Sequence, residues 1–390
     1  MSKTLNIQTE LLKLLLRDGT VTRPQCVKEL GVRPATVQEG INALKQRGLV
    51  QEPERTSLRT GRKAPLLTLV PDALWTAGIE VRGGYLHGVV VDAAGTPRAT
   101  VTRPGNYRFT REDYIEKILN TVNDLRKQCG DQWPRVKGIG FADPGLVDMK
   151  RGVSLYAVNL ANWSNLAIRE ELERFCALPA ALWPECAVST HLEYLQRAKS
   201  LGDGSLFYLG MGAGVGGGFI QNGRLFTGDQ NIAMEVGHIV VKPNGPPCRC
   251  GNHGCLEAVV GWRGISQRQY EAASGSVSSN MNIYDFDITD VVKHHATDKL
   301  ANIIATEVCE CIGTALATVV TLLNPTCIVL RGELTGLGGF LVSTIRRVLS
   351  ASCFPQALEN LRIELSTLEP DAVARGAALL MRDQILLENL

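Results

Sequence analysis

The stretch GHIVVKPNGPPCRCGNHGCLE at residues 237–257 is the most informative part of this sequence. His238 is followed by Cys248, Cys250 and Cys255, so an imidazole and three thiols lie within eighteen positions. A Cys-x-Cys pair with a third cysteine shortly after it fits a tight knuckle, to which a preceding strand can bring the histidine. These four groups are typical ligands of a tetrahedral Zn²⁺ ion. The stretch therefore predicts one structural zinc ion per chain.

Two alternatives to this ligand set stay open. His253 lies inside the knuckle and competes as the fourth ligand, because spacing does not exclude it. The cysteines could also be reduced thiols or a disulfide, although a disulfide is disfavoured in a reducing compartment. If all four ligands come from the protein, no coordination position remains for an activated water. The pattern therefore disfavours hydrolytic zinc chemistry.

Length and composition indicate a globular protein of two or three domains. The chain has 390 residues, of which 45% are hydrophobic, and a formal net charge of +2. Its long apolar stretch LATVVTLLNPTCIVL is interrupted by Asn324 and Pro325, so we expect no membrane span, and we expect no signal peptide. Eleven cysteines, an odd number spread over the chain, argue against a secreted disulfide framework. We expect a cytoplasmic protein.

The positive charge is concentrated near the N-terminus. Residues 1–71 hold twelve Lys or Arg against six Asp or Glu, whereas the remainder holds twenty-nine against thirty-three. The first segment therefore has a net charge of +6. A solvated charged face is the ordinary explanation of such a segment, but a DNA-binding motif in the same residues would favour a nucleic-acid partner.

Such a motif is present in residues 7–47. Leucines spaced three and four residues apart predict an amphipathic helix from Ile7 to near Gly19. Thr22 is placed to cap a second helix that runs to Leu30. A short turn then leads to a third helix at about 34–47. This is the spacing of a helix-turn-helix.

Two short strands at 48–54 and 62–70 enclose a basic loop, which predicts a winged helix. In such a domain the third helix enters the major groove, and cations of the wing meet phosphates or the minor groove. We expect a double-stranded DNA operator to be contacted by Arg33, Thr36, Gln38 and Lys45 around the third helix and by Arg59, Arg62 and Lys63 in the wing. Helix-turn-helix domains also serve as protein interaction modules, but the basic wing favours DNA.

Strands and helices alternate after Pro71, which predicts an α/β body. We expect a strand hairpin at 75–92, a buried strand that opens into a Pro-Gly turn at 136–148, and helices at 111–128, 164–175 and 186–199. Strand residues follow the glycine-rich stretch at 210–218, where a dinucleotide fold would need a helix. The stretch therefore predicts a glycine hairpin. Its amides can cradle a phosphate or let a sugar approach, and a tight turn without a ligand is the alternative.

Four motifs together resemble the ROK family, which contains repressors and sugar kinases. They are PGLVD at 144–148, GAGVGGG at 212–218, EVGH at 235–238 and CRCGNHGCLE at 248–257. The resemblance spans about residues 75–385 and implies a two-lobed, actin-like sugar kinase fold, with a sugar in the cleft and zinc bracing one wall. A winged helix in front of it resembles the repressor branch, which includes regulators that answer to xylose, glucose-type sugars and N-acetylglucosamine phosphate.

The resemblance also implies the residues that bind the sugar. Glu235 and Glu257 would accept hydrogen bonds from sugar hydroxyls. His238 could bind zinc through one ring nitrogen and a hydroxyl through the other. Asn162 and Glu185 are further expected partners of the hydroxyls.

The sequence departs from the kinases on the nucleotide side. Where the kinases carry Asp-x-Gly-Gly-Thr, this sequence has EVRGG at 80–84. Pro184-Glu185 replaces their catalytic Asn-Asp pair. Arg331-Gly332 replaces a double glycine. Arg82 places a bulky cation where backbone must approach phosphate. Glu185 is one methylene longer than the catalytic Asp, which disturbs the geometry of a general base. We therefore expect no enzyme activity and assign no catalytic residue.

These observations predict residues 1–71 to be a winged helix-turn-helix and 72–390 a ROK sugar-binding domain, with a small lobe at about 72–195 and a large lobe at about 196–390. The expected function is that of a sugar-responsive transcriptional regulator, a repressor released from its operator by a sugar or sugar phosphate. We expect a homodimer or a dimer of dimers and no membrane partner. Two alternatives are a bifunctional ATP-dependent sugar kinase with a DNA-binding arm and a DNA-binding protein whose ROK lobe only dimerises.

Overall fold

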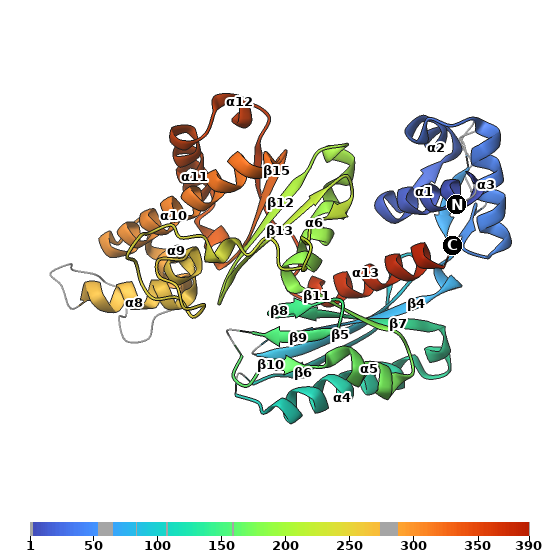
Figure 1. Cartoon of the computed structure of the whole chain (residues 1–390), viewed down its shortest axis with the longest axis horizontal. Coiled ribbons are helices and arrows are strands. Elements are labelled where there is room, and N and C mark those ends of the chain that lie inside the picture. The colour runs from blue at the N-terminus through green and yellow to red at the C-terminus, as the bar shows by residue number, and fades with distance from the viewer. Residues whose placement is uncertain are drawn as a thin grey trace. The chain divides into compact units, whose positions relative to one another are not determined.

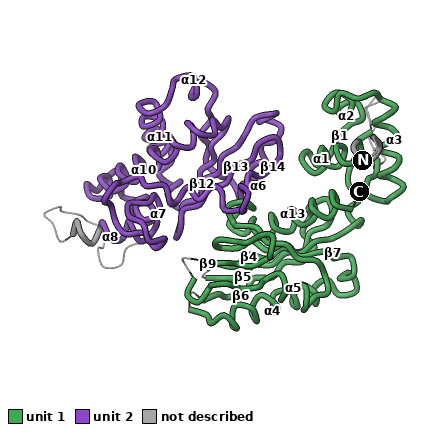
Figure 2. The backbone as a smooth tube through the Cα atoms, in the orientation of Figure 1, with its two compact units in different colours: residues 1–188, 369–390 green, residues 189–368 purple. Residues whose placement is uncertain are grey.

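The computed structural model describes residues 3–53, 65–82, 84–106, 108–157, 160–273 and 288–389. Its internal contacts divide the chain into two compact units, which Figure 2 colours separately. Unit 1 comprises residues 1–188 and 369–390, and unit 2 comprises residues 189–368. The chain therefore passes between the units twice, after Val188 and after Leu368.

The described residues up to Leu69 form a winged helix. Its elements are α1 (Lys3–Asp18), β1 (Thr20–Thr22), α2 (Arg23–Leu30), α3 (Pro34–Gln46), β2 (Val50–Gln51) and β3 (Leu66–Leu69), and its sheet has the order β1-β3-β2. The Thr22 hydroxyl accepts from the Gln25 amide while the Gln25 side chain accepts from the Thr22 amide, a capping box that fixes the start of α2. Gly31, at φ +61°, ends α2. The three predicted helices are confirmed.

The winged helix has a hydrophobic core of its own. Leu11 and Leu15 of α1 are buried against Ile41 and Leu44 of α3. Gly40 faces α1 so closely that a Cβ there would lie 2.7 Å from a Leu11 methyl carbon. The glycine that lowers the helix propensity of α3 is thus explained by helix packing.

The second part of unit 1 is a five-stranded sheet of order β11-β7-β4-β5-β6. Its strands are β4 (Trp75–Val81), β5 (Tyr85–Asp92), β6 (Pro97–Pro104), β7 (Val136–Asp143) and β11 (Ala180–Pro184). Helices α4 (Arg111–Cys129) and α5 (Ile168–Cys176) and a small sheet of β8 (Leu146–Asp148), β9 (Val153–Tyr156) and β10 (Ser164–Leu166) accompany it. Residues 164–166, expected to begin a helix, pair instead with β9, and α5 begins at Ile168.

The C-terminal helix α13 (Ala372–Glu388) packs directly on this sheet. A Cβ added at Gly78 of β4 would lie 1.9 Å from the Ala374 carbonyl oxygen, and one at Gly140 of β7 would lie 2.1 Å from the Ala377 carbonyl oxygen. Both positions therefore need glycine, because any larger residue would push the helix off the sheet. The sequence placed this last segment in the large lobe, whereas its contacts place it in unit 1.

Unit 2 holds a second five-stranded sheet, of order β14-β13-β12-β15-β16. Its strands are β12 (Leu206–Met211), β13 (Val215–Gln221), β14 (Arg224–Leu225), β15 (Cys327–Gly332) and β16 (Arg362–Leu365). Its helices are most of α6 (Glu185–Leu201), then α7 (Leu256–Val260), α8 (Trp262–Ala273), α9 (Ile288–His294), α10 (Lys299–Leu323), α11 (Gly339–Ser352) and α12 (Pro355–Leu358). Figure 2 labels α7, and Figure 1 labels the others. Antiparallel pairing of β12 with β13 confirms the predicted glycine hairpin.

Helix α10 is the central helix of unit 2. It is long and apolar enough to match a membrane span by length and composition, but 61% of its most apolar window is buried inside the protein. Ile304, Val308, Ile312 and Leu316 lie in the hydrophobic core of the unit. The apolar character of α10 is therefore explained by packing against its neighbours.

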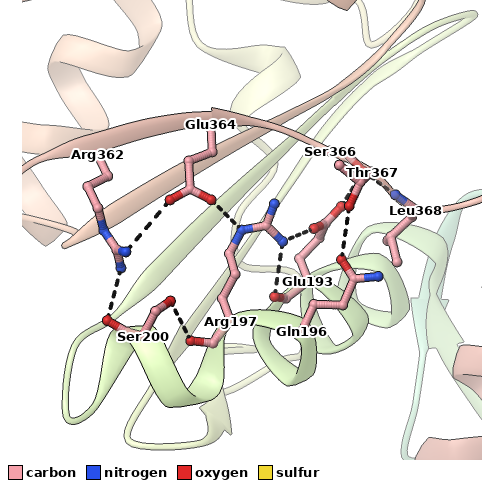
Figure 3. Close-up of polar contacts among 9 residues, drawn as sticks. All are labelled: Glu193, Gln196, Arg197, Ser200, Arg362, Glu364, Ser366, Thr367 and Leu368. Carbon is pink, nitrogen blue, oxygen red and sulfur yellow. Dashed lines mark hydrogen bonds and ion pairs between the residues drawn. The ribbon is translucent and has the colours of Figure 1, made fainter.

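A buried ionic network joins α6 to β16 near both chain crossings (Figure 3). The Arg197 guanidinium contacts Glu193 on the same helix and donates to Glu364 at 2.7 Å. The Ser366 hydroxyl donates to the fully buried Glu193 carboxylate. Each charge thus has a partner of opposite sign or a hydrogen bond, as burial requires.

We predict that Gly78→Ala will destabilise unit 1 by about 1–3 kcal/mol, because the new methyl group collides with the backbone of α13. Gly84→Ala is the matched control, since a Cβ at Gly84 meets nothing within 4 Å. Urea denaturation followed by fluorescence and circular dichroism measures both variants. Equal stability of the two variants would contradict the packing of α13 described above.

Candidate functional site

The predicted metal ligands lie together in unit 2. Donor atoms of His238, Cys248, Cys250 and Cys255 all lie within 4.8 Å of one another. The Cys250 and Cys255 sulfurs are 3.7 Å apart, and the Cys248 sulfur is 3.6 Å from His238 Nδ1. A tetrahedral zinc ion with Zn–S bonds of about 2.3 Å would separate two sulfurs by about 3.8 Å. The donor set and its spacing fit Zn²⁺.

His253 does not belong to this cluster. Its backbone amide donates to the Asn252 side chain at 2.8 Å, and its exposed ring is not among the grouped donors. The loop closes because Gly254 adopts φ +70° and approaches Lys242, where a Cβ would lie 1.8 Å from the carbonyl oxygen. The grouping of the donor atoms, which spacing alone did not reveal, thus decides between the two histidines.

The expected sugar-binding residues of unit 2 lie next to the metal cluster. Glu235 directly precedes the 3₁₀ turn η3 (Val236–His238), and Glu257 lies in the first turn of α7. Burial raises the pKa of Glu235, and the nearby Glu257 raises it further, against the opposing effect of His238. Glu257 also accepts from the Val215 amide at 3.0 Å and so holds the glycine hairpin. His238 turns Nδ1 to the thiols, which leaves Nε2 for a hydroxyl.

The expected partners in unit 1 are differently engaged. Glu185, the first residue of α6, accepts from Arg82 at 2.7 Å, and Arg82 also contacts the fully buried Glu80. Burial opposes the charge of Arg82, but the carboxylates of Glu185 and Glu80 raise its pKa. Asn162 is exposed and donates to the Phe109 carbonyl at 3.0 Å. Glu185 is therefore one end of an ion triad and not a free carboxylate.

Asp143 is a buried acid that sequence analysis missed. It ends β7, directly before the Pro-Gly turn, and its carboxylate accepts from the Gly145 amide at 2.8 Å. Burial raises the pKa of Asp143 to about 7, against hydrogen bonds with Ser154 and Gly145. The Ser154 hydroxyl also accepts from Trp163 Nε1 at 2.6 Å. The only signal in the sequence is an acid directly before the turn in FADPG.

The expected DNA contacts of the winged helix lie around α3. Arg33 precedes α3 and is exposed, and Thr36 is half-buried in its first turn. Gln38 donates to Asn42 at 2.8 Å, and the Lys45 ammonium lies 2.6 Å from the Glu52 carboxylate. The wing cations Arg59, Arg62 and Lys63 lie outside the described residues.

The same face carries two cations that sequence analysis did not select. An open groove separates α2 from α3, and Arg23 and Lys28 contribute to its walls. Its full lining is Arg23, Pro24, Val27, Lys28, Pro34, Val37 and Gln38. Arg23 is the first residue of α2. The sequence signal for it was a basic residue directly after Thr22, which caps the helix.

The family model that matches this chain is that of the ROK family, over residues 76–384. The chain belongs to the ROK family. The match begins directly after the winged helix, so the winged helix precedes the ROK region. The two five-stranded sheets agree with the two lobes of an actin-like fold.

Relatives of two kinds differ in how much of this chain they cover. A glucokinase of Thermotoga maritima is 27% identical and covers 79% of this chain and 97% of its own length. A xylose repressor of Caldicellulosiruptor bescii is 25% identical and covers 96% of this chain and 95% of its own length. The crystal structure of a ROK family transcriptional regulator, a homolog of the Escherichia coli MLC protein, has a TM-score of 0.81 at 23% identity and covers 100% of this chain and 97% of its own. The whole architecture is thus that of the ROK repressors.

We predict that Cys250→Ser will lose the metal. Purified wild type should contain zinc, because three thiols and an imidazole with this spacing bind it tightly. Cys353→Ser is the control, since Cys353 is a half-buried thiol outside the cluster. Elemental analysis after dialysis against a chelator measures zinc per chain. Zinc-free wild type, or equal zinc in both variants, would contradict the site.

We predict that Asp143→Asn will stabilise the protein increasingly as pH rises. In the unfolded chain an Asp ionises near pH 4, whereas folded Asp143 stays protonated until about pH 7. The free energy of unfolding of the wild type therefore decreases as the pH rises from about 4 to about 7. An Asn cannot ionise, so the variant avoids that loss. The gain should be small at pH 4 and a few kcal/mol, about 4 at most, at pH 8. Urea denaturation at both pH values tests this, and a difference independent of pH would contradict it.

Proposed function

We propose that this protein is a DNA-binding transcriptional repressor whose ROK domain binds a sugar or sugar phosphate and thereby releases the operator. The observation that carries the proposal is a winged helix joined to a complete ROK fold in one chain. The xylose repressor aligns over both parts, whereas the glucokinase covers 79% of the chain. Such a chain has a DNA-binding part and a ligand-binding part.

The sugar is bound by carboxylates and an imidazole that the metal loop positions. Glu235 and Glu257 accept from sugar hydroxyls, and His238 Nε2 completes the set while Nδ1 faces the metal. Asn162 and Glu185 are proposed to contribute from unit 1. A zinc ion, one per chain, would hold His238 and the loop before Glu257 in place and has a structural role.

Ligand binding is proposed to change the arrangement of the DNA-binding heads in a homodimer or a dimer of dimers. A dimer that spans two operator half-sites needs a fixed distance between its recognition helices. A ligand that binds a different arrangement of the two chains more tightly shifts the protein toward that arrangement. The resulting loss of operator affinity is set by the difference between its affinities for the two arrangements. The protein would carry out this function in the cytoplasm, with no membrane partner.

Phosphoryl transfer is not part of the proposal. Arg82 occupies the hairpin where the family's kinases hold phosphate, and it pairs with Glu185, which aligns with their catalytic base. A carboxylate oxygen that already accepts from Arg82 at 2.7 Å is not free to take the proton of a sugar hydroxyl in the geometry that general-base catalysis needs. The Arg82–Glu185 ion pair therefore supports ligand binding without catalysis.

We predict that Glu235→Gln will abolish the response to sugar without changing operator affinity in its absence. A lost hydrogen bond to a charged acceptor lowers ligand affinity about tenfold or more. A thermal-shift screen of sugars and sugar phosphates identifies the ligand. Fluorescence anisotropy with a selected operator duplex then measures release, with Glu10→Gln as control, because Glu10 lies on α1 of the winged helix, paired with Lys13.

The same ligand is tested for catalysis in a coupled assay of ADP release. Wild type should show no sugar-dependent ADP release. Steady turnover on the order of 1 per second or more would establish the bifunctional kinase instead. A wild type that binds DNA but responds to no ligand in the screen would favour a ROK domain that only dimerises.

A further inference from the structure

One carboxylate on the DNA-binding face of the winged helix holds two of its cations. Glu52 directly follows β2 and accepts from Arg23 through both oxygens, at 2.8 and 2.7 Å. The Lys45 ammonium donates to the second of these oxygens at 2.6 Å. Arg23 begins α2 and Lys45 lies in the last turn of α3, so Glu52 bridges the two helices of the motif.

The triad is partly shielded from water, which strengthens its ion pairs. The Glu52 side chain is 11% exposed, whereas Arg23 and Lys45 are 40% and 36% exposed. Burial works against the charge of Glu52, but the hydrogen bonds of Arg23 and Lys45 outweigh it and lower its pKa. Glu52 is therefore ionised at neutral pH. The two-oxygen bond to a planar guanidinium is the stronger geometry for such a pair.

The position of the triad is that of the expected DNA contacts. Lys45 shares one face of α3 with Gln38 and Asn42, which are joined by a hydrogen bond. Arg23 lines the groove between α2 and α3, together with Gln38. The exposed parts of both cations therefore border the surface that would meet a duplex, while Glu52 offsets one of their two charges and occupies donors of both.

We propose that Glu52 is an electrostatic brake on DNA binding: its single negative charge offsets one of the two positive charges of Arg23 and Lys45, its oxygens occupy donors of both, and it so lowers the affinity of the winged helix for phosphate. A cation that keeps a protein carboxylate as its partner releases fewer counterions from DNA. Weak non-specific binding favours a repressor, because the genome offers a large excess of competing sites. This inference rests on the DNA binding proposed above and adds a residue that sets its strength.

The test compares Glu52→Gln with wild type on a short random-sequence duplex, by anisotropy titration over a series of salt concentrations. Freeing the two cations should raise affinity about tenfold at low salt and steepen the salt dependence by about one to two units of slope, at about 0.9 per phosphate contact. Glu10→Gln removes the same charge from α1, where Glu10 pairs with Lys13 at 2.6 Å. It should leave the slope nearly unchanged.

Second-site variants show whether the gain comes through these two cations. Arg23→Gln and Lys45→Gln should each change binding less in the wild-type background than in the Glu52→Gln background, because Glu52 occupies donors of both cations. In the Glu52→Gln background each should remove about half of the gain in slope. Such non-additivity is the signature of residues in direct contact.

Other outcomes overturn the proposal. If Glu52→Gln lowers thermal stability and leaves affinity and slope unchanged, Glu52 is a structural link between α2 and α3. If it weakens operator binding alone, Glu52 accepts from a cytosine amino group and acts in base recognition. A wild-type protein that binds neither a selected operator nor random DNA contradicts the proposed function itself, and that result is separate from any effect of Glu52.

Discussion

The contact of α13 with the glycines of its sheet constrains the rest of the structure. Since Gly78 and Gly140 let carbonyl groups of Ala374 and Ala377 approach β4 and β7, the last helix belongs to the unit that the chain enters first. The chain must therefore cross between units twice. At its far end α13 contributes Leu386 to the core of the winged helix, and the Asn389 carbonyl accepts from Arg47. One helix thus supports both the lobe and the DNA-binding head.

The two crossings are joined on the unit 2 side by the network of Figure 3. Glu193 and Arg197 lie on α6, a few residues after the first crossing, and Ser366 lies just before the second. Removing Arg197 would leave the buried Glu193 carboxylate without a cation, which costs several kcal/mol. The network therefore fixes how the crossing segments are held within unit 2.

The sequence predicted whatever depends on short-range patterns and missed what depends on long-range contacts. Caps and leucine spacing located the three N-terminal helices, and Cys-x-Cys with a nearby histidine located the metal cluster. Helix α13 belongs to unit 1 because it packs on two glycines more than two hundred residues before it in the chain. Local patterns do not reveal such a contact, so they placed α13 in the other lobe. The choice of His238 over His253 depended on how the folded loop groups the donor atoms, which spacing does not reveal. Partners of charged residues, such as Glu52 and Arg82, were equally invisible, since charge alone does not reveal pairing.

That last limit bears directly on function, because both the winged helix and the β4–β5 hairpin of unit 1 carry cations that are paired with carboxylates. Taken alone, Arg82 suggests a group that binds phosphate. Its guanidinium is paired with the carboxylates of Glu80 and Glu185, so its positive charge is already balanced within the protein. Arg23 and Lys45 alone suggest DNA contacts, yet they share Glu52, which offsets one of their two charges. In each case the guanidinium or ammonium remains partly exposed, so a ligand can reach its free donors while the internal acid weakens the attraction. Net charge therefore overstates the attraction of this chain for phosphate, and the carboxylates are the residues through which that attraction can be tuned.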